Sequence, residues 1–221
     1  MKYLDKRELK ELGDQILKQN DAEDVLLWIS KFIYPLNHIG DIDVYCFMKH
    51  KKGKFPNTYQ DIPLDVEVVS GKKIKKIFDK FHMHYLLSLQ ELKLLLRLKT
   101  GLTVSSEFSG LRKEIKRISK SELYKKIEFY WYQEYKSSLD DVEKFKNPSS
   151  SFKCSEAYLA YKLCSRNIPI VKAKWIYLMS KNIFQNTENL AIKKILTQWD
   201  NINILQSDLV STLKEEELYD K

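Results

Sequence analysis

Turn-forming residues are concentrated in one part of this 221-residue chain. Six of its eleven glycines and prolines fall between Pro35 and Gly71, whereas residues 111–147 and 170–221 contain neither type. Glycine permits unusual backbone angles and proline removes an N–H donor, so both mark turns and the ends of helices and strands. The distribution predicts helices on both sides of one turn-rich insert.

The insert contains two runs with strand character. Residues 42–48 and 64–69 are rich in β-branched and aromatic residues, and Asp65-Val66-Glu67-Val68 alternates polar and apolar with the period of a strand. We therefore predict a mainly α, multi-helix globular protein with one small β-hairpin insert at approximately residues 42–69. The Pro-Ser stretch after Asn147 predicts a helical domain over 1–147, with the hairpin and basic helices, and a C-terminal helical subdomain over 148–221, unless the two form one continuous domain.

Helix signals flank the insert. Asp5 and Glu8 have capping-box spacing before an apolar stripe, which predicts a helix over about 6–19. Ser88 and Glu91 have the same spacing and predict a helix that ends near Gly101. A second helix is expected from Asp21, because four apolar residues recur there at helical spacing. These residues are Val25, Trp28, Ile29 and Phe32.

The composition bounds the class of protein. A hydrophobic content of 43% with 31% charged residues is typical of a globular chain and not of a disordered one. The sequence has no apolar run long enough to span a bilayer and no apolar signal segment near its start. Its three cysteines are an odd number without metal-site spacing. We expect a cytoplasmic protein in a reducing environment, with free thiols, no cofactor and no membrane partner.

The positive charge is confined to one segment. Residues 71–126 hold fifteen Lys and Arg against five Asp and Glu, whereas 1–70 hold ten against twelve and 127–221 thirteen of each. A localised basic excess is typical of a surface that binds a polyanion. We therefore expect a non-enzymatic nucleic-acid-binding accessory or regulatory protein that contacts mainly phosphates, since lysine outnumbers arginine.

Two other interpretations of the basic segment stay open. Its helices can form a lysine-rich solvated surface, or they can dock an acidic protein partner. Residues 88–118 also have the order of a helix-turn-helix module, whose second helix would enter a DNA groove. The candidate nucleic-acid-binding residues are Lys49, Lys51, Lys52, Lys54, Lys72, Lys73, Lys76, Arg112, Lys113, Lys116, Arg117 and Lys120.

Two pairs of carboxylates lie on the expected strands. Asp41 and Asp43 are two residues apart, as are Asp65 and Glu67, so the members of each pair share one face of a strand. Carboxylate oxygens are ligands that Mg²⁺ prefers. The Asp-hydrophobic-Asp-hydrophobic run of residues 41–44 resembles the core motif of nucleotidyltransferase-fold proteins. That resemblance implies a metal-dependent nucleotidyl transfer, which is the enzymatic alternative for this chain.

The rest of the pattern favours a structural role for these carboxylates. The nucleotidyltransferase family also has a Gly-Ser turn that grips the triphosphate, and no Gly-Ser pair precedes Asp41. A restriction-type nuclease would need a lysine just after Glu67, where this chain has valines. The sequence therefore predicts that the four carboxylates do not converge. They would instead form the polar face of a hairpin beside the basic loop 49–54.

Overall fold

The computed structural model describes residues 4–34, 40–48, 53–104, 109–145, 148–199 and 211–213. The chain divides into two compact units, Met1–Leu123 and Tyr124–Lys221. The boundary that the sequence suggests near residue 147 falls between α5 (Lys120–Phe145) and α6 (Pro148–Cys164), inside the second unit. Within the described ranges, no helix is long and apolar enough to cross a membrane.

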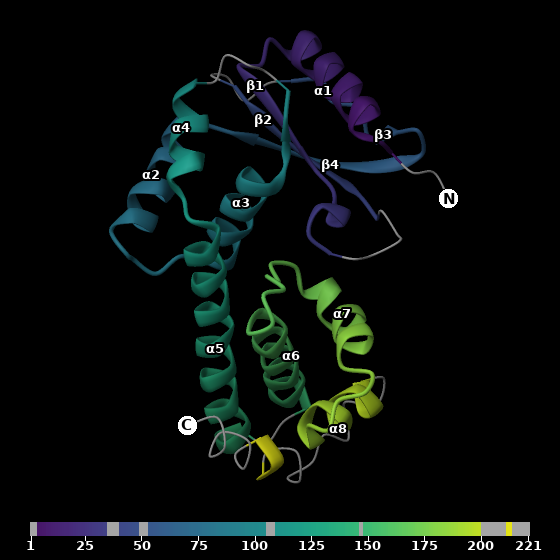
Figure 1. Ribbon diagram of the computed structural model, residues 1–221, viewed down its shortest axis with the longest axis vertical. Helices are drawn as coiled ribbons and strands as arrows, with labels where there is room; N and C mark the ends of the chain where they lie inside the picture. The colour runs from purple at the N-terminus through teal and green to yellow at the C-terminus, as the bar shows by residue number, and fades with distance from the viewer. Residues whose placement is uncertain are drawn as a thin grey trace. The chain divides into compact units, whose positions relative to one another are not determined.

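The first unit is built on a five-stranded mixed sheet (Figure 1). Its strands are β1 (Asp24–Trp28), β2 (Ile42–Phe47), β3 (Thr58–Tyr59), β4 (Ile62–Val69) and β5 (Leu102–Thr103), in the spatial order β3-β4-β2-β1-β5. β1 pairs antiparallel with both β2 and β5, and β3 pairs antiparallel with β4. The central pair, β2 and β4, is parallel.

This sheet corrects the predicted fold class. The described part of the chain is mainly helical, but the prediction of a mainly α protein with only a β-hairpin insert at residues 42–69 is wrong, because the two predicted strands belong to a larger mixed sheet and pair parallel. The hairpin in this region joins β3 to β4 through Gln60 and Asp61, whose φ angles are 50° and 68°. Because parallel strands cannot be joined by a tight turn, the chain crosses over between β2 and β4 through this extra hairpin.

The helix predicted from Asp21 is also wrong, since this segment forms β1. All five residues of β1 are buried. A strand covered on both faces has a continuous apolar run and lacks the polar and apolar alternation of a half-exposed strand. The spacing of Val25, Trp28 and Ile29 therefore fitted a helix equally well, and periodicity could not separate the two.

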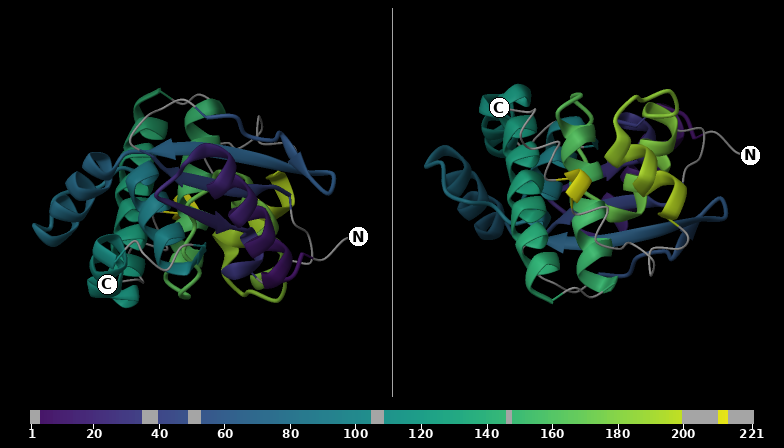
Figure 2. Two further views of the ribbon diagram at one scale, coloured as in Figure 1. Left: turned by 90° about the horizontal axis from the view of Figure 1, so that it is seen from above. Right: turned by 90° about the horizontal axis from the view of Figure 1, so that it is seen from below.

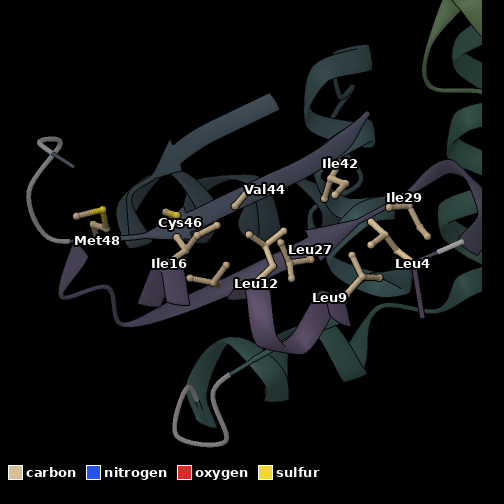
Figure 3. Packing of buried hydrophobic residues seen from close by; sticks show 11 residues of the cluster. Leu4, Leu9, Leu12, Ile16, Leu27, Ile29, Ile42, Val44, Cys46 and Met48 are labelled. Carbon is tan, nitrogen blue, oxygen red and sulfur yellow. The ribbon is translucent and has the colours of Figure 1, made fainter. Parts of the chain in front are cut away.

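One face of the sheet packs against α1 (Lys6–Asn20) (Figure 3). The capping box predicted for this helix is confirmed, with Asp5 and Glu8 in reciprocal hydrogen bonds. Alternate residues of β1 and β2 point to this face, as the two-residue period of a strand requires. The buried cluster comprises Leu4, Leu9, Leu12, Ile16, Val25, Leu27, Ile29, Ile42, Val44, Cys46 and Met48.

The other face of the sheet meets α3 (Leu89–Thr100). The capping box of Ser88 and Glu91 at its start is confirmed. Trp28 of β1 donates from its indole Nε1 to Thr100 Oγ1 at 3.0 Å, which attaches the end of α3 to the sheet. Before α3, α2 (Gly71–His82) continues from β4 and extends away from the sheet (Figure 2). After α3 come β5 and α4 (Ser109–Arg117).

The second unit is helical in its described part. It contains most of α5, then α6, the short 3-10 helix η2 (Ala173–Trp175), α7 (Ile176–Ile183) and α8 (Leu190–Gln198). Trp131 of α5 is buried and donates from Nε1 to the Ile170 carbonyl at 2.7 Å. Tyr135 of α5 and Tyr158 of α6 pack with ring centroids 5.1 Å apart, so aromatic contacts join these two helices.

All three cysteines of the chain are free, as predicted, and buried.

Candidate metal centre

Three aspartates converge on the α3 side of the sheet. Asp41 immediately precedes β2, and Asp43 lies two residues later on the same face. Asp65 of β4 is the direct partner of Asp43 in the parallel register. Each of the three offers a carboxylate oxygen, and these atoms all lie within 4.8 Å of one another. The prediction that these carboxylates would not converge is therefore wrong for Asp41, Asp43 and Asp65.

The spacing of the three oxygens fits a small divalent cation. Oxygen ligands on opposite sides of one Mg²⁺ lie about 4.2 Å apart, because each Mg–O bond is about 2.1 Å. The observed limit of 4.8 Å exceeds that value by an amount that small side-chain rotations can remove. Asp43 is buried, Asp41 is partly buried and Asp65 is exposed, so the cluster is anchored in the sheet and reached from solvent at Asp65.

Glu67, the fourth candidate carboxylate, does not join this group. It lies beside Tyr45 in the parallel register, one step further along β4 than Asp65 on the same face. Its Oε1 is 2.8 Å from the Nζ of Lys73 in α2, and both side chains are about half exposed. Glu67 is therefore held by a surface ion pair.

The positive partner of the cluster is Arg97 of α3, which the sequence analysis missed. Arg97 and Asp43 are each 1% exposed, and Arg97 Nη2 lies 2.5 Å from Asp43 Oδ2. Arg97 Nη1 also donates to the Tyr45 hydroxyl. The guanidinium lies over the ring of Trp28, 4.9 Å from its centroid, and near that of Tyr45. Two aromatic residues and one carboxylate therefore fix its position.

Tyr45 contributes a neutral phenol to this network. Burial raises the pKa of Tyr45 far above its ordinary value, and the charge of Arg97 offsets only part of the rise. The hydroxyl therefore stays protonated at physiological pH while its oxygen accepts the hydrogen bond from Arg97. Asp43 is thus the negative group that directly contacts the guanidinium.

Ser30 is a second residue that the sequence analysis missed. It follows β1 as the first residue of the 3-10 helix η1 (Ser30–Phe32) and is 1% exposed. Its Oγ has no hydrogen-bond partner among the described residues. The antiparallel register pairs Trp28 with Asp43, so two further steps would bring Ser30 opposite Asp41. A buried hydroxyl without a partner is costly and is typical of a site that receives a ligand or water.

The predicted nucleic-acid-binding residues are distributed over several elements. Lys72, Lys73 and Lys76 of α2 are exposed, as are Lys113, Lys116 and Arg117 of α4, Lys120 of α5 and Lys54 before β3. Lys49, Lys51, Lys52 and the side chain of Arg112 lie outside the described part of the chain.

Two of these basic helices approach each other. His82 Nε2 at the end of α2 lies 3.8 Å from Glu114 Oε2 of α4. Acidic neighbours hold some of the positive charge, since Lys73 pairs with Glu67 and Arg117 with Glu114. Within the helix-turn-helix candidate, Leu102 of β5 pairs with Leu27 of β1, so the connection between α3 and α4 forms an edge of the sheet.

Comparisons with known proteins identify no relative. No family model matches the chain, and no curated protein matches its sequence. The aspartate cluster and the placement of charge are therefore the features of this protein that bear on its function.

Proposed function

We propose that this protein is a divalent-metal-dependent nucleotidyltransferase. The observation that carries the proposal is the convergence of Asp41, Asp43 and Asp65 from two parallel strands within 4.8 Å. The resemblance of residues 41–44 to the core motif of nucleotidyltransferase-fold proteins supports it. The family pattern has a Gly-Ser turn before this motif, and at the end of the preceding strand this chain has Ile29-Ser30, which keeps the serine but lacks the glycine. The buried hydroxyl of Ser30 is free to donate to a phosphate oxygen.

The proposed reaction transfers a nucleoside monophosphate from a triphosphate to a hydroxyl group. The acceptor oxygen forms a bond to the α-phosphorus, the bond between the α- and β-phosphates breaks, and pyrophosphate leaves. A bound Mg²⁺ would supply Lewis-acid stabilisation of the negative charge on the phosphates. Asp41 and Asp43 would hold the cation against the sheet. Asp65, the most exposed of the three, is placed to accept the proton of the acceptor.

Metal binding and transfer can be tested with matched variants. Asp41→Asn and Asp65→Asn each remove one cluster carboxylate, and neither residue is fully buried. Glu67→Gln is the control, because it removes a carboxylate from the same face of β4 that lies outside the cluster. Calorimetry with Mn²⁺ measures binding, and α-³²P-labelled nucleoside triphosphates with RNA, protein and small-molecule acceptors measure transfer.

We expect the parent chain and Glu67→Gln to bind Mn²⁺ and to transfer label. Each Asp→Asn variant should lose at least about tenfold in Mn²⁺ affinity, since a carboxylate ligand is replaced by a neutral amide. Equal Mn²⁺ binding by all four proteins, or none by the parent even with a non-hydrolysable triphosphate present, would show that the cluster is not a metal centre.

A second function, nucleic-acid binding, is favoured by the charge on α2 and α4. These helices belong to the same unit, approach each other at His82 and Glu114, and carry exposed lysines. If this surface binds phosphates, affinity falls linearly with the logarithm of salt, with a slope near −0.9 per contact on B-DNA. The two proposals are compatible, because a transferase with such a surface would act on a nucleic acid.

The variant for this test replaces Lys72, Lys76, Lys113 and Lys116 by Gln. The control replaces Lys181 and Lys193, which are exposed lysines of the second unit. We expect the variant with four substitutions to bind duplex DNA or RNA more weakly at low salt. Its slope of log affinity against log salt concentration should be shallower by about 1–4 units. Identical salt slopes for the parent and the variant with four substitutions would instead indicate that the basic surface of α2 and α4 is solvated or faces a protein partner.

A further inference from the structure

Burying Arg97 at its position in α3 has a large cost in desolvation free energy. The neighbouring Leu96 and Leu98 are buried, and Arg97 itself is 1% exposed. Removing a guanidinium from water has a large cost, and a well-packed apolar residue in place of a buried ion pair is often neutral or stabilising. Arg97 Nε has no hydrogen-bond partner among the described residues, which adds to that cost. Stability alone therefore gives a weak reason for an arginine here.

The surroundings of Arg97 hold it rigidly against Asp43. Its guanidinium lies over the ring of Trp28 and over that of Tyr45, and the indole of Trp28 donates a hydrogen bond to Thr100. Oδ2 of Asp43 accepts from Arg97 Nη2, which orients the plane of the carboxylate. Asp43 is thus contacted through Arg97 by α3, a helix that supplies none of the three clustered carboxylates.

Arg97 also changes the charge that a cation meets. Counted by formal charge, the three aspartates and one arginine of this group sum to minus two. An arginine stays protonated in proteins, so this positive charge is permanent. Because Arg97 and a bound cation would share the same carboxylate of Asp43, their mutual repulsion opposes metal binding in a buried environment, where screening is weak.

We propose that Arg97 is a positioning residue of the metal centre that fixes the carboxylate of Asp43 and lowers the affinity of the aspartate cluster for free divalent cations. One divalent cation would then neutralise the formal charge of the cluster. A second cation would bind only together with a negatively charged triphosphate. This inference rests on the proposed metal-dependent function. It adds that the centre fills together with nucleotide and stays weakly occupied without it.

The test compares Arg97→Met, Arg97→Gln and Arg97→Lys in the full chain. Calorimetry gives the Mn²⁺ affinity without nucleotide and with a non-hydrolysable triphosphate, and circular dichroism with thermal melting checks folding. Arg97→Gln is the fallback if Arg97→Met does not fold, because glutamine is neutral and still donates to a carboxylate. Arg97→Lys keeps the charge and is the conservative variant.

Neutral substitutions should raise Mn²⁺ affinity without nucleotide at least about tenfold, since the repulsion is removed. They should also lower nucleotidyl transfer, because Asp43 loses its fixed orientation. Arg97→Lys should keep the Mn²⁺ affinity within about threefold of the parent, because its charge is retained. A merely structural role would weaken or leave unchanged the Mn²⁺ affinity of folded neutral variants, and that result would overturn the inference.

The two proposals fail in different ways. If the parent binds no Mn²⁺ even with the non-hydrolysable triphosphate, or if Asp65→Asn binds it as the parent does, the metal-centre proposal fails. If the parent binds Mn²⁺ through its aspartates but folded Arg97→Gln binds it no more tightly, only the role of Arg97 is refuted.

Discussion

A disulfide across the central strand pair would test the strand direction on which the metal centre depends. Cys46 of β2 and Val68 of β4 are partners in the parallel register, and both lie on the side of the sheet that packs against α1. Neighbouring strands lie about 4.8 Å apart, within the range of Cα separations of about 4.4–6.8 Å that a disulfide requires. Val68→Cys should therefore form a bond with Cys46 under oxidising conditions.

The expected gain in stability follows from the length of the closed loop. Residues 46–68 form a loop of about 22 residues, for which the chain-entropy estimate is about 3 kcal/mol. For a unit of this size, this gain corresponds to a rise of about 10 °C in the melting temperature. Strain at the new bond would reduce this value. The comparison is made between oxidised and reduced samples of the same variant.

Leu64→Cys is the matched control for this cross-link. Leu64 lies on the same face of β4 as Val68, but its partner in the parallel register is Ile42. Four residues along a strand span about 13 Å, which is beyond the limit of about 7 Å for a disulfide. Leu64→Cys should therefore stay reduced under the conditions that oxidise Val68→Cys.

The assay must allow for the low reactivity of Cys46. Burial raises the pKa of the Cys46 thiol to about 12, so little thiolate forms in the folded protein at pH 8. The bond should be formed during refolding in a glutathione buffer and detected by mass spectrometry of peptides. A cross-link in Leu64→Cys but not in Val68→Cys would refute the parallel pairing. Asp43 and Asp65 would then no longer be neighbours.

Two further predictions test the fold of the first unit by urea unfolding. Gly13→Ala should destabilise it by about 1–2 kcal/mol, because overpacking outweighs the gain in helix propensity; a Cβ there would meet Val104 Cγ2 at 2.2 Å. Asp61→Gly should stabilise it by about 0.5 kcal/mol, since φ at Asp61 is 68° and glycine adopts this angle readily. A stabilising effect of Gly13→Ala would contradict the packing of α1. A destabilising effect of Asp61→Gly would contradict the β3–β4 turn.

Features set by local contacts could be predicted from the sequence. The helices that start after Asp5 and Ser88 were placed correctly, because a capping box joins residues only three positions apart. β1 could not be assigned in this way. Its burial comes from α1 on one face and α3 on the other, and neither contact is visible in the five residues of the strand.

Arg97 illustrates the same limit at the candidate site. The sequence shows a charged residue among leucines, which is unremarkable on a helix with one solvated side. Only tertiary packing shows that this side meets Trp28 and Tyr45 and is closed to water. A buried arginine was nevertheless detectable in principle. Leu94, Leu95, Leu96 and Leu98 point in several directions around α3, so few exposed positions remain for a charge.

The direction of one strand decides whether the aspartates form a centre. In an antiparallel hairpin of residues 42–48 and 64–69, Met48 would lie opposite Leu64, and Asp43 would face Val69. Asp43 and Asp65 would then stand four residues apart along the sheet, about 13 Å from each other, too far to share one cation. The prediction that the carboxylates stay apart came instead from the missing Gly-Ser pair and the missing lysine, and it did not take the strand direction into account. Alternation with a period of two is identical in both directions, so no pattern within the strands separates the alternatives. The parallel pairing instead makes Asp43 and Asp65 direct neighbours, and Asp41 joins them because it shares a face with Asp43.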